Sequence, residues 1–249
     1  MTLLRPLLIA FSVYSRIPVP SIEWNERDNR LALAFLPLVG CVIAVCFIAV
    51  DALFLDFSPL LRATLCLSAV VLVTGGIHMD GFLDTCDALS SYKEREARLA
   101  ILKDVHVGAF AVIRSLLLVT LLIALYAESR QPIAMSMGFV SARCGALVLL
   151  CMLPNARKSG MLNAFQGGLA KHAVLLSAVI FAAASIAIAF FFASSAALAG
   201  FMLQLIFAAI FYRKALKLFG GITGDLAGYA VTMMELCWAL GLVLGGKWL

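Results

Sequence analysis

Three aspartates follow one another at helical spacing near the end of an apolar segment. Asp80, Asp84 and Asp87 stand at i, i+4 and i+7 in the sequence GGIHMDGFLDTCDALSS, which places all three on one face of a helix. Carboxylates this close together repel one another unless a divalent cation lies between them. The pattern therefore predicts a metal site. The competing interpretation is a solvated helix start that the helix dipole favours, but apolar Phe82 and Cys86 occupy the opposite face.

A second group of polar residues belongs to a glycine-rich turn with the sequence GGITGDLAG. Gly220, Gly221, Thr223 and Gly224 precede Asp225 where an apolar helix is expected to begin. Glycine-rich turns expose backbone N–H groups, and a helix N-terminus favours anions, so this segment is predicted to hold phosphate. Asp225 is interpreted either as the N-cap of the helix or as a fourth metal-binding carboxylate.

Charged residues between the acidic segment and the next apolar run divide into two groups. Lys103 and Asp104 are predicted to belong to the site, because they return the chain toward the segment where Asp80 begins. The preceding basic residues are interpreted as a solvated helix face or as phospholipid contacts; they are Lys93, Arg95 and Arg98.

Two charged residues fall inside expected membrane helices, where a charge is costly. Glu235 is therefore predicted to point into the helix bundle. The sequence is equally consistent with two roles for Arg143: an ion pair with an inward-facing acid, or a contact with the substrate. Arg157 and Lys158 lie in a basic, glycine-containing loop, which either binds phosphate or only carries positive charge.

The composition indicates an integral membrane protein. Of the 249 residues, 63% are hydrophobic and 13% charged, whereas a soluble domain has about 25% charged residues. We predict an all-α, polytopic bundle that forms a single domain over residues 1–249. It should have about seven transmembrane helices, an N-terminal half-span and cytoplasmic interfacial helices. At ~20 residues for each span, the expected segments are 31–55, 59–74, 108–127, 132–153, 172–193, 196–212 and 226–245.

The distribution of positive charge predicts which side the candidate residues face. When the seven segments alternate in direction, the N-terminal segment and the three polar loops with the candidate residues share one side. Most of the 19 Lys and Arg residues fall there, and only Arg62, Arg130 and Lys247 fall on the other side. The positive-inside rule then places the candidate site in the cytoplasm. Oxygen ligands favour Mg²⁺ or Mn²⁺ over zinc, and carboxylates with Mg²⁺ and phosphates are typical of phosphoryl or nucleotidyl transfer.

The chain resembles the cobalamin synthase family, also called adenosylcobinamide-GDP ribazoletransferases. The acidic string HMDGFLDTCD is accompanied, in family order, by RIPVP, PLVG, LKDxxxGAF, ARKSGM and GGITGDLAG. The resemblance implies a Mg²⁺-dependent enzyme of the bacterial cytoplasmic membrane whose site faces the cytoplasm. Such an enzyme joins adenosylcobinamide-GDP to α-ribazole or its 5′-phosphate and releases GMP. The expected partners are these substrates and membrane lipid, not nucleic acid; a homo-oligomer and contacts with other corrinoid-pathway enzymes stay open.

The resemblance also implies roles for individual residues. The metal-binding carboxylates would be Asp80, Asp84 and Asp87, and the place of Asp225 in the turn makes it the candidate for a fourth. The base that accepts a proton from the attacking hydroxyl would be Asp87, His78 or Asp104. Phosphate charge would be held by Lys103, Arg143, Gly220, Gly221, Thr223 and Gly224. The chain departs from the family pattern at Ala88, Val105, His106, Tyr229 and Thr232.

Two other classes of protein fit the sequence less well. A CDP-alcohol phosphotransferase would have Ala-Arg two residues after Asp80-Gly81, where this chain has Asp84-Thr85. A cation or proton transporter would place its acids near the bilayer midplane in broken helices, whereas these acids are expected at one edge of the membrane.

Overall fold

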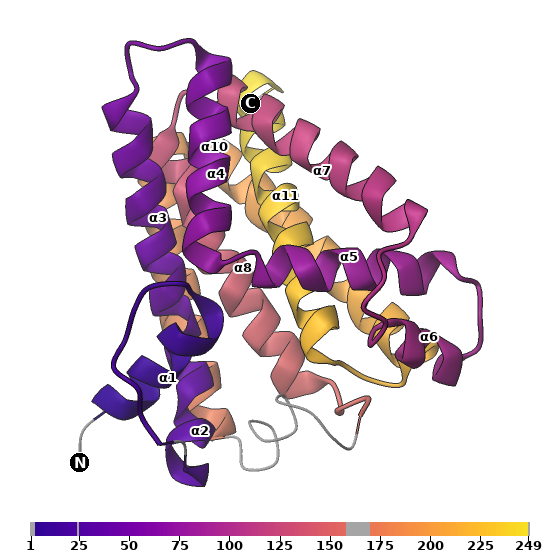
Figure 1. Ribbon diagram of the computed structural model, residues 1–249. Coiled ribbons are helices and arrows are strands. Elements are labelled where there is room, and N and C mark those ends of the chain that lie inside the picture. Colours follow the sequence, from indigo (N-terminus) through magenta and orange to yellow (C-terminus); the bar gives the residue numbers. More distant parts are fainter. Residues whose placement is uncertain (1–2, 24, 158–169, 249) are drawn as a thin grey trace.

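In the described part of the chain the regular structure is helical, apart from one isolated β-bridge (Figure 1). The computed structural model describes residues 3–23, 25–157 and 170–248. The short helices in this part of the chain are α1 (Leu4–Tyr14), α2 (Glu26–Ala32), the 3₁₀ turn η1 (Leu33–Phe35) and α6 (Arg95–Ile101). The longer ones are α3 (Leu36–Leu53), α4 (Pro59–Thr74), α5 (Ile77–Ser90), α7 (Ala109–Glu128), α8 (Pro132–Met152), α10 (Lys171–Phe219) and α11 (Gly224–Trp248). The predicted all-α membrane bundle is confirmed.

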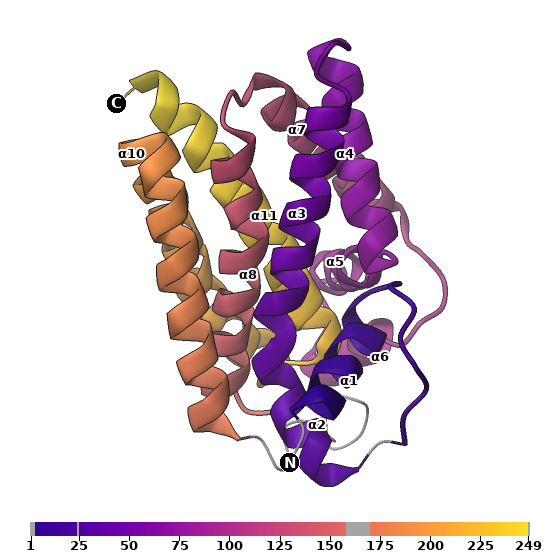
Figure 2. The ribbon, with the colours of Figure 1, turned by 90° about the vertical axis from the view of Figure 1, so that its left-hand side faces the viewer.

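Six helical segments of the described chain are long and apolar enough to cross a membrane. They match six of the seven predicted segments, and two of them, Lys171–Ala193 and Ser195–Phe219, make up α10. These halves run side by side in opposite directions, because Ala178 of the first half lines the same cavity as Tyr212 near the end of the second. Figure 2 shows the first half at the edge of the bundle beside α8.

The remaining predicted span, residues 59–74, forms α4, and a sharp bend follows it. After α4 the chain turns by 92° into α5. Gly75 and Gly76 form the turn with φ angles of 63° and 76°, values that residues with a Cβ adopt only at a cost. The described chain therefore has six spans, or seven if α4 and α5 count as one, which agrees with the prediction of about seven. The turn directs α5 across the bundle, where it packs against α7 and α11 (Figure 1).

The charged segment after α5 forms a shorter helix than expected. The sequence predicts an amphipathic helix that starts at Lys93 and closes at Lys103-Asp104, whereas α6 has 7 residues. Arg98 is buried, and its guanidinium donates to the Ala88 carbonyl oxygen at 3.1 Å and to the Lys93 carbonyl oxygen at 2.6 Å. Arg98 thus satisfies carbonyl groups at and after the end of α5, so its assignment to a solvated or lipid-facing surface was wrong.

Several segments that carry candidate residues lie at one end of the bundle, whereas α5 crosses the bundle nearer its middle (Figure 1). In Figure 1 the N-terminus, α6 and the turn between α10 and α11 lie at the lower end, and the C-terminus lies at the upper end. The connections between α3 and α4 and between α7 and α8 are also at the upper end in both views. This arrangement agrees with the alternation of spans that the sequence predicts.

Candidate functional site

The closest approach between α5 and α11 lies at Gly81. A Cβ atom on this residue would be 2.6 Å from the carbonyl oxygen of Asp225 and 3.0 Å from its Cα atom. Next to this crossing the rings of Phe82 and Tyr229 stack with centroids 5.5 Å apart and planes 9° apart. Only glycine allows two helices to approach this closely. The crossing brings the aspartates of α5 beside the acid at the start of α11.

The structure gathers four predicted acids into one electrostatic environment. Asp84 is half-buried and lies within electrostatic range of Asp80, Asp87 and Asp225, while Arg157 is the cation that offsets their repulsion. Asp80 and Asp225 also line one cavity. Because Asp84 has three like charges around it, a divalent cation at this place would relieve a strong repulsion.

Asp87 differs from the other acids because the backbone of α7 already binds both of its oxygens. The Gly108 amide donates to Oδ2 at 2.6 Å, and the Ala111 amide donates to Oδ1 at 2.9 Å. Asp87 therefore satisfies first-turn amides of α7, where the helix dipole favours a negative charge. The loop with Lys103 and Asp104 consequently ends beside Asp87, not beside Asp80 where the sequence led us to expect it.

The acids suit magnesium only in combination with a phosphate-bearing ligand. In the part of the chain that the structure describes, no three His, Cys, Asp or Glu side chains form a ready-made metal site. Mg²⁺, however, is usually held by one or two carboxylates together with substrate phosphates and water. Asp80, Asp84 and Asp225 supply oxygen donors of the kind that Mg²⁺ prefers, so the donor set fits this ion when phosphate completes it.

The two glycines predicted to bind phosphate instead end α10. The Gly220 amide donates to the Leu216 carbonyl oxygen at 3.0 Å, and the Gly221 amide donates to the Ala215 carbonyl oxygen at 3.2 Å. These are the bonds of a helix C-terminal cap. Both amides are therefore occupied, and the geometry does not favour them as phosphate donors.

The second half of the same turn starts α11. The Thr223 hydroxyl oxygen accepts from the Leu226 amide at 3.2 Å, so Thr223 caps the helix and Asp225 does not. Gly224 is the first residue of α11, and the first amides of a helix have no acceptor within it. Of the predicted phosphate-binding residues in this turn, Gly224 has the most suitable position.

Arg157 reaches the site through a pairing between distant segments. The Ala156 amide donates to the Ile222 carbonyl oxygen at 2.9 Å, and the Ile222 amide donates to the Pro154 carbonyl oxygen at 2.9 Å. Arg157 then extends toward α11, where its Nη1 lies 3.2 Å from Oδ2 of Asp225. The structure thus assigns Arg157 to the site, a question the sequence left open. Lys158 lies outside the described residues.

Arg95 lies against the turn between α10 and α11, a contact that the sequence did not predict. Its guanidinium lies so close to Gly220 that a methyl group on that glycine would collide with it. Arg95 is exposed, and it belongs to α6, whose Leu99 carbonyl oxygen accepts a hydrogen bond from Arg157 at 3.0 Å. The contact joins residues 95 and 220, so no local pattern signals it.

This geometry predicts that Arg95 holds phosphate charge more effectively than Lys103. Arg95→Ala should weaken binding of a nucleotide substrate about tenfold, because an arginine that pairs with phosphate contributes roughly 1–2 kcal/mol. Lys103→Ala, which removes an exposed loop charge, should change the dissociation constant less than about twofold. Titration of both variants with the nucleotide substrate would measure the difference, and a larger loss in Lys103→Ala would show that the loop binds phosphate.

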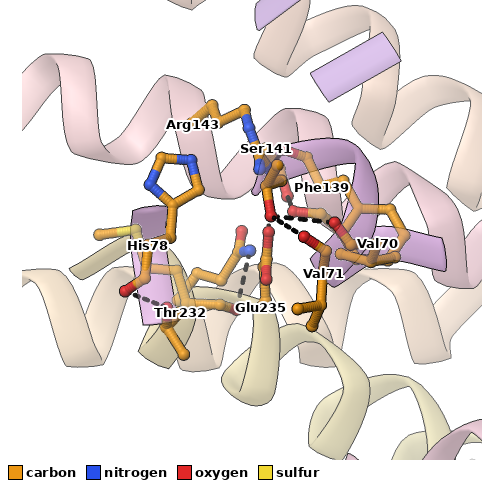
Figure 3. A network of polar contacts seen from close by, with 12 residues as sticks. Val70, Val71, His78, Phe139, Ser141, Arg143, Thr232 and Glu235 are labelled. Atoms are coloured by element: carbon orange, nitrogen blue, oxygen red, sulfur yellow. Dashed lines mark hydrogen bonds and ion pairs between the residues drawn. The ribbon is translucent and has the colours of Figure 1, made fainter. Parts of the chain in front are cut away.

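Arg143 is buried in the interior of the bundle, where it lies close to His78 and Glu235 (Figure 3). Its Nη1 is 2.8 Å from Oε1 of Glu235 and also donates to the Phe139 carbonyl oxygen at 2.7 Å. Its side chain is 0% exposed and that of Glu235 is 11% exposed. The inward orientation of Glu235 is confirmed. Of the two roles considered for Arg143, the geometry favours the structural ion pair over phosphate binding.

The two remaining proton-acceptor candidates occupy different places. His78 is buried at the start of α5, where its carbonyl oxygen accepts from the Thr232 hydroxyl at 3.2 Å, and it lines the same cavity as Asp80. Asp104 is exposed and accepts from the backbone amide and ring Nδ1 of His106 at 3.0 and 2.7 Å. These hydrogen bonds lower the pKa of Asp104, which makes it a weaker proton acceptor.

Comparisons with known proteins identify the family of this chain. The cobalamin-5-phosphate synthase family matches residues 6–243. An adenosylcobinamide-GDP ribazoletransferase of Lachnoclostridium phytofermentans is 39% identical over 97% of this chain and 94% of the relative. Proteins of the same name from Brevibacillus brevis and Desulfitobacterium hafniense are 33% identical (98% of this chain, 99% of the relative) and 32% identical (96% of each). No solved structure is significantly similar. The chain is a transferase and belongs to the cobalamin-5-phosphate synthase family.

Proposed function

We propose that this protein joins adenosylcobinamide-GDP to α-ribazole or α-ribazole 5′-phosphate. The products are adenosylcobalamin or its 5′-phosphate, and GMP. Membership of the family and the names of the relatives support this reaction. The observation that carries the assignment to a site is the crossing at Gly81, which places the α5 acids beside Asp225 and Arg157.

The reaction replaces the phosphoanhydride bond of the donor with a phosphate ester bond to the acceptor. A ribose hydroxyl of the acceptor attacks the phosphorus atom attached to cobinamide and forms a new P–O bond. The bond between that phosphorus and the bridging oxygen breaks, and GMP leaves with the bridging oxygen. The hydroxyl proton passes to a base. His78 is the best-placed of the predicted acceptors, because it lines the cavity with Asp80, whereas both oxygens of Asp87 are engaged.

Positive charge near the acids would bind the diphosphate of the donor. Asp80, Asp84 and Asp225 would hold Mg²⁺, which supplies charge that stabilises the phosphates and the leaving group. Arg157 contacts Asp225 from one side of the site. Arg95 covers the neighbouring turn at Gly220. Arg95 would orient the nucleotide by contacts with phosphate oxygens, while Arg157, which binds Asp225 and the Leu99 carbonyl oxygen, would position that acid.

The site end of the bundle is proposed to face the cytoplasm of a bacterial inner membrane, because most positive charges lie at that end. A reporter fused after Ser91 should therefore be cytoplasmic, and a reporter fused after Ser129 should be periplasmic. Paired fusions to alkaline phosphatase and green fluorescent protein at each position provide the control, since only one of the two is active on each side. The opposite pattern at both positions would contradict the proposed orientation.

The reaction is tested by GMP release from the purified protein in lipid. Adenosylcobinamide-GDP and Mg²⁺ are supplied with or without α-ribazole, and GMP is quantified. Release that requires α-ribazole and stops on addition of EDTA is the expected result. Release without an acceptor would indicate hydrolysis, and no release from folded protein would contradict the proposed function.

A further inference from the structure

A cavity of 240 Å³ lies next to the acids, between α1, α3, α5, α8 and α11. Asp80 and Asp225 form its polar end. The rest of its wall is largely apolar and includes Tyr14, Leu36, Leu150 and Val231. A cavity with apolar walls and carboxylates at one end suits a ligand with an apolar part and a reactive polar part.

Two aromatic residues form part of this wall. The rings of Tyr14 and His78 lie nearly parallel, with centroids 6.4 Å apart and planes 21° apart, and both residues line the cavity. Flat aromatic surfaces of this kind suit a planar aromatic ligand. The His78 Nε2 atom is enclosed by protein and does not belong to the accessible wall.

We propose that this cavity binds the aromatic base of the acceptor nucleoside, with the ribose directed toward Asp80 and Asp225. This inference rests on the proposed function. The base of α-ribazole is a planar benzimidazole with two methyl groups and one free ring nitrogen, so most of its surface is apolar and matches the apolar and aromatic wall of this cavity.

The donor fits the cavity less well on two grounds. Its corrin ring is far larger than a space of 240 Å³. Its guanine base carries donors and acceptors on several edges, and an apolar wall would leave these groups without partners. The size and the polarity of the cavity therefore both favour the acceptor over the donor.

The experiment measures binding of α-ribazole to the protein in lipid nanodiscs by calorimetry, without donor or metal. Ala227→Leu fills the cavity from α11, and Val13→Phe fills it from α1, since both residues line it. Ala184→Leu is the matched control, because Ala184 is exposed on α10. Each filling variant should weaken α-ribazole binding at least about tenfold, while the control and the affinity for adenosylcobinamide-GDP should stay within about twofold.

The outcomes separate this inference from the proposed function. If the wild-type protein binds α-ribazole and both filling variants bind it equally well, the base lies elsewhere and the inference is overturned. The same holds if the filling variants lose affinity for the donor instead of the acceptor, or if an adenine nucleoside binds as tightly as α-ribazole. If the wild-type protein neither binds α-ribazole nor releases GMP, the proposed function itself fails.

Discussion

Replacing Asp84 by asparagine is expected to abolish GMP release while the protein stays folded in the membrane. Asparagine keeps the shape of the side chain but removes the charge from a position surrounded by Asp80, Asp87 and Asp225. Loss of a carboxylate that supports Mg²⁺ should reduce turnover at least about 100-fold, the effect of a few kcal/mol in the transition state. Turnover is measured as GMP formed per enzyme with saturating substrates and Mg²⁺.

The same substitution should leave thermal stability unchanged or slightly raised, because it removes repulsion among the acids. A loss of turnover without a loss of stability therefore distinguishes a metal-site role from a structural role. Asp56→Asn is the matched control, since Asp56 is exposed between α3 and α4. Wild-type turnover by Asp84→Asn with Mg²⁺ present would contradict the assignment of Asp84.

Replacing Arg143 by methionine is expected to produce the largest loss of stability. The change leaves Glu235 without its partner inside the bundle, and removal of one member of a buried ion pair costs about 3–5 kcal/mol. Unfolding in detergent, followed by circular dichroism or thermal shift, measures the change. The double variant Arg143→Met/Glu235→Leu should recover much of the lost stability, because it leaves no unpaired charge.

An exposed ion pair provides the control for this experiment. Lys247 and Glu128 are 3.1 Å apart, with side chains 61% and 59% exposed. Lys247→Met should therefore change stability by less than about 1 kcal/mol. If Arg143→Met retains wild-type stability but loses affinity for the donor, Arg143 binds phosphate and the structural assignment is wrong.

The sequence predicts most helices because their ends carry local signals. The boundaries of α4 match the prediction, with Ser58 accepting from the Leu61 amide at its start, Pro59 in its first turn and left-handed Gly75 at its end. The two halves of α10 were also separated at the correct place. The direction of α5 could not be predicted, because a pair of glycines permits a turn without determining its angle.

The sequence predicts the acids of the candidate site but not the arginines near them. Helical spacing alone places Asp80 and Asp84 together, and the apolar run after Asp225 indicates a helix start. Arg157 and Arg95 reach the site only because Ile222 pairs with residues 154–156 and α6 covers Gly220. Such contacts depend on packing between segments far apart in the sequence, which no local pattern reveals.

The most direct test of the central claim is a titration with Mn²⁺, followed by electron paramagnetic resonance, in the presence and absence of adenosylcobinamide-GDP. Asp80, Asp84 and Asp225 do not form a complete metal site by themselves, so the donor phosphates should be needed to complete it. We therefore expect Mn²⁺ to bind at least about tenfold more tightly with the donor than without it, and Asp84→Asn to remove this gain. Equal Mn²⁺ affinity with and without the donor, or an unchanged gain in Asp84→Asn, would contradict a metal site shared by these acids and the substrate.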